Sequence, residues 1–253
     1  MTKKLTALAL LVLVLLPLGA QSTDPVILSY QRNFIRASMS TKIELLSDAS
    51  RITTVNMSPL YIVALGFSLQ SWPVLGSDAQ LIDLTSIAAS KVAFYQDASA
   101  LPAIRSVFRA IPDTKVRVSC LNSWASLAKG QKDEISFLNT WFSDSLDTAS
   151  KGTPSDTKVL STCATALGKI ADASSFPVLF KGATASVDSG IVLASAAALN
   201  AITDGYTDNI LAIIATKRVK DMYAAFSFAM KKETLTPQER AKISRAAFEA
   251  ATD

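Results

Sequence analysis

The chain of 253 residues contains no histidine. This absence excludes Ser-His-Asp and Cys-His catalytic arrangements and most zinc sites, because each of them depends on an imidazole side chain. There are only two cysteines, Cys120 and Cys163, and no second cysteine or histidine lies near either one in the sequence. A glycine-rich phosphate-binding loop is also absent. We therefore expect no catalytic, cofactor-binding or metal-ligating residues.

Long apolar runs are scarce as well, and the one clear example is Leu5–Leu18, which follows Lys3 and Lys4. Positive charge before an apolar segment of this length is typical of a secretory signal peptide, which we assign to residues 1–20 with cleavage after Ala20. The run is shorter than the ~20 residues that a membrane-spanning helix needs. We expect an exported protein, periplasmic or secreted, with no membrane span after signal cleavage. Retention of the segment as an anchor is the alternative.

Excess positive charge is small once that segment is removed. The 25 Lys and Arg side chains become 23 against 21 acidic ones, a net charge of +2. The basic residues are scattered along the sequence, and their densest group is Lys217, Arg218 and Lys220. A nucleic-acid-binding domain gathers positive charge on one surface, so no nucleic-acid partner is expected.

Apolar residues recur at intervals of three and four along the chain, among many Ala, Leu and Ser and few Gly. This spacing is typical of packed amphipathic helices, and no segment alternates with the period of two expected for strands. Thr236 and Glu239 have the spacing of a capping box. Prolines also stand where helices are expected to begin, since the first helical position needs no N–H: Pro59, Pro102, Pro177 and Pro237. The sequence predicts an all-α fold.

The sequence repeats itself at intervals that suit a pair of helices. Residues 113–128 align without a gap with residues 156–171, at an offset of 43 that pairs Cys120 with Cys163. A second match, at an offset of 32, extends the pattern to residues 191–202. Unit starts then fall near residues 40, 78, 113, 156, 188 and 216. We therefore expect about six stacked helical hairpins.

Residues 113–117, Asp-Thr-Lys-Val-Arg, together with Cys120, resemble the start of the second helix of a HEAT repeat. The pattern in that family is a turn aspartate, then Val-Arg, then a small residue. The next unit, from Val159 to Ile170, is similar to the same helix, with Leu160 in place of the arginine. The resemblance to the HEAT/armadillo family is clearest over residues 98–215.

This resemblance implies a right-handed α-solenoid in which the second helix of each hairpin lines a concave face. After the signal peptide at 1–20, which the apolar run indicates, we expect a helical repeat domain at 21–232 and a C-terminal capping helix at 233–253. The resemblance also implies that Asp113 caps a helix and that Arg117 pairs along the stack. It implies no enzymatic activity.

Equivalent positions in successive units are expected to be buried between helices. Ala166 and Ala198 are equivalent at the offset of 32, so an aspartate at either position should destabilise the fold. Cys120 and Cys163 occupy the small-residue position on successive second helices. Axes of packed helices lie ~8–10 Å apart, whereas the Cα atoms joined by a disulfide lie within about 7 Å of each other. We expect both thiols to be buried and free, although export would favour a disulfide.

Two patterns that carry catalysis in other proteins occur in this chain, and both have simpler explanations. Ser-x-x-Lys occurs at Ser126 and Ser155, in a chain rich in both residue types and without the partner motifs of that enzyme class. Three aspartates fall in the Ser-, Thr- and Asp-rich stretch 143–156, namely Asp144, Asp147 and Asp156. We interpret this stretch as a solvated loop between helices.

Exposed tryptophans dominate many protein interfaces. Trp124 occupies a helix position with apolar neighbours and is expected in the core. Trp72 and Trp141 are therefore the candidate partner-binding residues. Arg105 and Arg109, four residues apart, are expected to form a solvated outer face.

These observations predict a non-catalytic scaffold or adaptor that binds a protein partner through the concave face of the solenoid. Two alternatives remain open. One is an envelope enzyme, or an accessory of one, with its site in the irregular 143–156 region. The other is a structural component of the cell envelope.

Overall fold

The computed structural model describes residues 24–252, so the predicted signal peptide at 1–20 lies outside the described residues. All regular structure in the described part is helical, as the sequence predicts, and no strand occurs there. The α-helices are α1 (Pro25–Arg36), α2 (Met39–Ala49), α3 (Ser58–Leu75), α4 (Ala79–Val92), α5 (Leu101–Ala110), α6 (Thr114–Leu127), α7 (Lys132–Ser150), α8 (Thr157–Ile170), α9 (Phe176–Thr184), α10 (Ser189–Ala201), α11 (Tyr206–Ile214), α12 (Val219–Lys231) and α13 (Pro237–Thr252). None of these helices is both long enough and apolar enough to cross a membrane.

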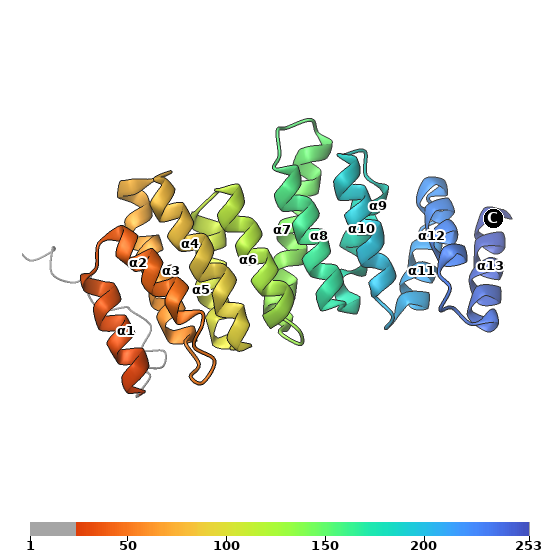
Figure 1. The fold of residues 1–253 in the computed structure, drawn as a ribbon. Helices are drawn as coiled ribbons and strands as arrows, with labels where there is room; N and C mark the ends of the chain where they lie inside the picture. Colours follow the sequence, from red (N-terminus) through yellow and green to blue (C-terminus); the bar gives the residue numbers. More distant parts are fainter. Residues whose placement is uncertain (1–23, 253) are drawn as a thin grey trace, which may run out of the picture.

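The helices stand side by side in one elongated row, from α1 at one end to α13 at the other (Figure 1). Each odd-numbered helix from α1 to α11 packs against the even-numbered helix that follows it in the sequence. The even-numbered helices also pack on one another in order, α2 on α4, α4 on α6, α6 on α8 and α8 on α10. The row therefore has an odd-numbered and an even-numbered layer, with the apolar core between them.

Local signals in the sequence account for the helix boundaries. The even-numbered helices begin at residues 39, 79, 114, 157, 189 and 219, within three residues of the repeat starts. Asp78, Asp113 and Asp156 each accept a hydrogen bond of 3.0 Å from the main-chain N–H three residues later. This caps an N–H group that has no partner within the helix. Thr236 and Glu239 form the predicted capping box, with hydrogen bonds of 2.9 and 3.2 Å.

The prediction of a loop over residues 143–156 is wrong, because α7 continues into that stretch and only residues 151–156 connect it to α8. Leu146 is fully buried on the inner side of the helix. On the outer side, the Thr148 hydroxyl donates to the main-chain oxygen of Asp144 at 2.9 Å. Burial of the apolar side of the helix keeps this polar segment helical.

The backbones of α8 and α10 approach each other closely. A Cβ atom added at Gly168 of α8 would lie 2.6 Å from the Cβ and 2.7 Å from the Cα of Ala198 in α10. Ala198 is 4% exposed, and Ala166, its repeat equivalent on α8, is 2% exposed. Both alanines are therefore buried, as the repeat alignment predicts.

The largest aromatic cluster joins α5, α6 and α7. The Phe108 ring meets Trp124 at 5.3 Å, Phe137 at 6.3 Å and Trp141 at 4.8 Å between ring centroids, each edge to face. Trp124 is fully buried, which confirms its predicted place in the core. These large side chains fill the space between α5 and α7 at the middle of the row.

Candidate interaction surface

The even-numbered helices in the middle of the row leave one side uncovered. Because α4, α6 and α8 each contact one odd-numbered helix and two even-numbered helices, their exposed and half-exposed side chains lie on the remaining side. We call this surface the even-helix face. It comprises Gln80, Asp83 and Ser90 of α4, Lys115, Asn122 and Ser126 of α6, and Lys158, Thr162, Thr165 and Lys169 of α8.

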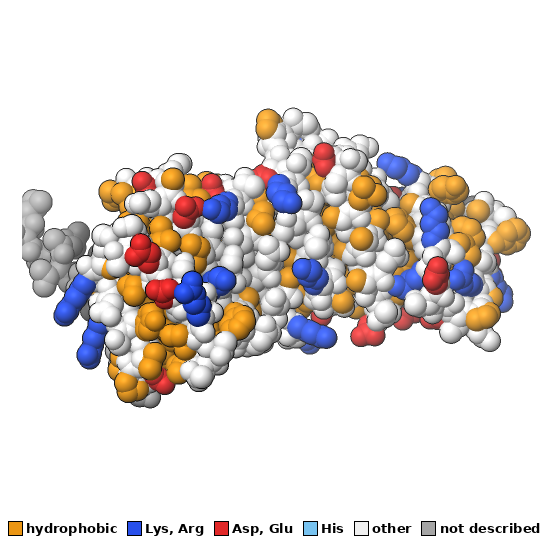
Figure 2. All heavy atoms as spheres, viewed as in Figure 1, with side chains coloured by type: hydrophobic (Ala, Val, Ile, Leu, Met, Phe, Trp, Pro, Cys, Tyr) orange, Lys and Arg blue, Asp and Glu red, His pale blue; other side chains and the backbone are white. Residues whose placement is uncertain are grey.

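Most side chains of the even-helix face are polar and uncharged. Over α6 and α8 the surface in Figure 2 carries few hydrophobic side chains and a few isolated basic ones. Thr162 and Thr165 donate their hydroxyl hydrogens to main-chain oxygens of α8 at 2.8 and 2.9 Å. Their oxygen lone pairs are thus left as acceptors, while Lys158 and Lys169 have no side-chain partner among the described residues. The face therefore presents both hydrogen-bond acceptors and hydrogen-bond donors.

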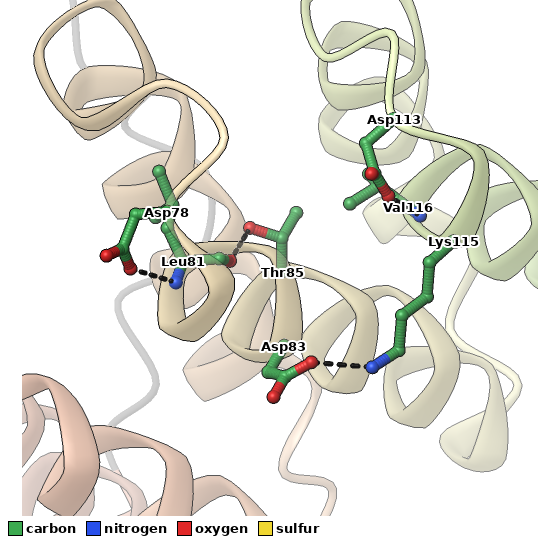
Figure 3. A network of polar contacts seen from close by, with 7 residues as sticks. All are labelled: Asp78, Leu81, Asp83, Thr85, Asp113, Lys115 and Val116. Carbon is green, nitrogen blue, oxygen red and sulfur yellow. Dashed lines mark hydrogen bonds and ion pairs between the residues drawn. The ribbon is translucent and has the colours of Figure 1, made fainter.

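Polar side chains link neighbouring even-numbered helices near their N-terminal ends. Lys115 of α6 and Asp83 of α4 point toward each other and form an ion pair of 2.6 Å (Figure 3). Thr114 of α6 donates to Asp156, the capping residue of α8. Since both members of the ion pair are at least half exposed, its contribution to stability is about 0–1 kcal/mol. These links orient side chains across the face more than they stabilise it.

The contacts of Arg117 differ from the predicted pairing along the stack. Its Nε donates to the main-chain oxygen of Phe108 at 3.2 Å, and its guanidinium lies 5.4 Å from the centre of the Phe108 ring. Both contacts are to α5, the partner of α6 in the same helix pair, and not along the stack. Burial lowers the pKa of Arg117, and the Asp156 carboxylate at the start of α8 opposes that shift. Arg117 therefore forms no ion pair with the next helix pair among the described residues, and only the charge of Asp156 acts on it from there.

The two candidate tryptophans do not form one site. Trp72 lies near the end of α3 and Trp141 in α7, and α5 stands between those helices in the row. Both are half-buried against the core. Trp141 also borders a shallow cavity of about 360 Å³ between α6, α7 and α8, whose polar lining includes Arg117, Asp144 and Asp156.

Sequence reasoning missed a polar network that ties three helices together. Glu134 of α7 is 9% exposed, and its carboxylate accepts hydrogen bonds from Arg105 at 2.7 and 3.1 Å and from the Trp124 indole N–H at 2.9 Å. The Arg105 guanidinium also lies over the Phe137 ring at 5.1 Å. The prediction of a solvated outer face is therefore wrong for Arg105, although Arg109 is exposed.

Cys120 and Cys163 are free and buried. Burial raises the pKa of the Cys120 thiol to about 12 and raises that of Cys163 further. Because the thiolate is the reactive form, we predict that neither thiol reacts with iodoacetamide in the native protein at neutral pH. Mass spectrometry should find both modified only after unfolding without reductant. A quantitative Cys120–Cys163 disulfide, or rapid native labelling, would contradict this packing.

The two Ser-x-x-Lys patterns lie at separate places in the structure. Ser126 and Lys129 are exposed at the end of α6, and the Ser126 hydroxyl lies 3.5 Å from the main-chain oxygen of Asn122. Ser155 lies in the connection between α7 and α8, and its lysine partner, Lys158, is exposed on α8. In the described part of the chain, no cluster of acidic side chains and cysteines could hold a metal ion.

Neither the comparison with models of known protein families nor the comparison with curated proteins finds a match to this chain. The similarity to HEAT repeats therefore rests on the residues themselves, chiefly Asp113 to Arg117 and Cys120.

Proposed function

We propose that this protein is an exported, non-catalytic scaffold that binds a protein partner through its even-helix face. The observation that carries the proposal is the uninterrupted packing of α2, α4, α6, α8 and α10 on one another, which builds one long surface on regular helices. Helical repeat proteins bind macromolecules through extended surfaces of this kind. Export follows from the signal peptide assigned to residues 1–20, and the compartment is then periplasmic or extracellular.

The finer architecture belongs to the same proposal. We regard the row as a right-handed α-solenoid of six HEAT-like hairpins, α1–α2 to α11–α12, closed by α13. Support comes from the even-numbered helices, whose first residues match the repeat starts, and from the aspartate caps that recur at Asp78, Asp113 and Asp156. In this architecture the even-helix face is the concave face.

The chemistry of the face also describes its partner. Lys158 and Lys169 offer ammonium donors, while Thr162 and Thr165 offer hydroxyl acceptors. A matching protein surface would present carboxylates opposite the lysines and amide or hydroxyl donors opposite the threonines. Because the face is polar, it can remain exposed to water when the partner is absent. It therefore suits a partner that folds separately and binds afterwards.

Affinity capture with cross-linking from the native cell envelope tests this proposal. We expect a stoichiometric protein partner with the parent chain and at least tenfold less of it with the double variant Ser126→Glu/Thr165→Glu, which places two anions on the even-helix face, where they repel the carboxylates of the partner. The matched control is Ser136→Glu/Thr140→Glu, which places the same charges on exposed positions of α7. Equal capture by both variants, or equal loss, would contradict the assignment of the face.

The cavity beside Trp141 favours a second candidate, an envelope enzyme or an enzyme accessory. Asp144 and Asp156 line it together with Arg117, but the Asp156 carboxylate is already bonded to the N-terminal turn of α8 and to Thr114. A turnover abolished by Asp144→Asn, with partner capture unchanged, would support this candidate. A purely structural envelope component, the third possibility, would yield neither a discrete partner nor turnover.

A further inference from the structure

Positive charge is concentrated at the C-terminal end of the row. Residues 216–252, which form α12, α13 and the adjoining turns, carry eight basic and four acidic side chains, a net charge of +4. Residues 24–215 carry 15 basic and 16 acidic side chains, a net charge of −1. The scattered basic residues of the sequence therefore leave one strongly positive region in the folded chain.

Large apolar side chains stand exposed in the same region. Val219 and Tyr223 are each 75% exposed and lie one turn apart on α12, and Phe248 of α13 is 70% exposed. Hydrophobic and basic side chains lie among one another over α12 and α13 in Figure 2. Exposure this high means that these side chains project from the surface, since a side chain within a groove would be partly covered by its walls.

The exposed side of α12 combines both kinds of residue. Lys220 and Lys231 lie on the same side of the helix as Val219 and Tyr223, at helical spacings of three, four and eight residues. The opposite side of α12 carries Ala225 and Ala229, which are four residues apart and buried in the core. Among the described residues, neither Lys220 nor Lys231 has a side-chain hydrogen bond or ion pair. Both ammonium groups are thus available to an external anion.

We propose that the α12–α13 end docks on the surface of an anionic lipid bilayer. Val219, Tyr223 and Phe248 enter the interface between headgroups and acyl chains, where aromatic and aliphatic side chains are stable. Lys220 and Lys231 face the lipid phosphates, whose surface potential attracts basic residues. An interface of lipids adapts to projecting side chains, whereas a protein partner would need preformed pockets for all three. This inference is independent of the even-helix face and of its partner.

A reporter placed on α13 tests the docking locally. Since Cys120 and Cys163 are buried, Ser244→Cys, at an exposed position one turn from Phe248, gives a site for a polarity-sensitive fluorophore. The mature chain, which begins at Gln21 after signal cleavage, is mixed with vesicles of phosphatidylcholine alone or with phosphatidylglycerol. We expect a blue shift only with phosphatidylglycerol, weakened by salt. The matched reporter Ser136→Cys on α7 should not shift. The same shift with neutral vesicles or at Ser136, or no shift at Ser244, would overturn the proposal.

Variants then separate the apolar from the electrostatic contribution. Val219→Ser/Tyr223→Ser/Phe248→Ser and Lys220→Gln/Lys231→Gln should each raise the vesicle Kd at least about thirtyfold. The control Val74→Ser removes an apolar side chain of α3 that is 85% exposed and should change the Kd less than about twofold. Melting curves check that each variant is folded. If Val74→Ser raises the Kd as much as the other variants, docking of the α12–α13 end on a bilayer is excluded. A reporter shift with polyglutamate but not with vesicles would also exclude the bilayer and would indicate an acidic protein as the partner.

Discussion

Replacing Ala198 with aspartate is expected to lower the free energy of unfolding by about 4 kcal/mol. Ala198 is 4% exposed and faces the α8 backbone at Gly168, where an added Cβ would lie only 2.6 Å from the Ala198 Cβ. A carboxylate there has neither space nor a positively charged partner. It would force α8 and α10 apart or be buried without hydration. Ala166→Asp, at the equivalent position of α8, should have a similar effect.

Urea unfolding followed by far-ultraviolet circular dichroism measures this loss, and the melting temperature should fall by about 8–16 °C. Ala197→Asp and Thr165→Asp are matched controls, because each places the same charge on the same helix one residue away, at an exposed position. The controls should change the stability by less than about 1 kcal/mol. If buried and exposed variants melt together, the packing of α8 against α10 is not as described.

Glu134→Ala is expected to cost about 2–4 kcal/mol, because it removes the acceptor that joins Arg105 and Trp124. The Trp124 N–H would be left buried without a partner. The expected loss of stability is smaller than for a fully buried ion pair, because the Arg105 side chain is 31% exposed and solvent screens its attraction to Glu134.

Glu134→Gln separates the two contributions, since it keeps an acceptor for the Trp124 indole but loses the charge that attracts Arg105. It should therefore lose less stability than Glu134→Ala. Asp133→Ala, at the exposed neighbouring position, is the control and should be nearly neutral. A double-mutant cycle with Arg105→Met measures the coupling directly. A coupling energy near zero would show that the network does not stabilise the contact between α5 and α7.

The sequence allowed much of the fold to be predicted because its local signals agree with one another. Asp113 and Asp156 cap helices at positions that the repeat offset of 43 also marks. Trp124 was correctly assigned to the core by its apolar neighbours at helical spacing. Each of these features depends on residues within a few turns of one helix, and such features can be read from one segment at a time.

Predictions failed where packing at longer range decides the outcome. Polar composition suggested a loop over 143–156, but burial of Leu146 against other helices keeps most of it helical. The sequence suggested that Arg105 lies on a solvated face, but its guanidinium donates a hydrogen bond to Glu134, which is 29 residues away in the sequence. Arg117 bonds back to Phe108 and not to the next unit, because the end of α5 lies within reach.

The surface itself was only partly predictable. Trp72 and Trp141 were chosen by residue type, and the structure places them on separate helices of the odd-numbered layer. The basic group at Lys217, Arg218 and Lys220 is evident in the sequence, but only the folded chain shows that the neighbouring Val219 and Tyr223 are exposed. Exposure depends on which side of each helix its neighbours cover, and a single sequence does not state this.

Site-specific photo-cross-linking tests the central claim most directly, by comparing exposed positions on the two layers in the native cell envelope. The even-helix face is sampled at Ser90, Asn122 and Thr165, and the odd-numbered layer at Gln70, Ser106 and Ser136. We predict that the three even-layer positions cross-link to the same protein and that the three odd-layer positions do not. Cross-linking of one partner from the odd-numbered layer alone, or equally from both layers, would contradict binding through the even-helix face.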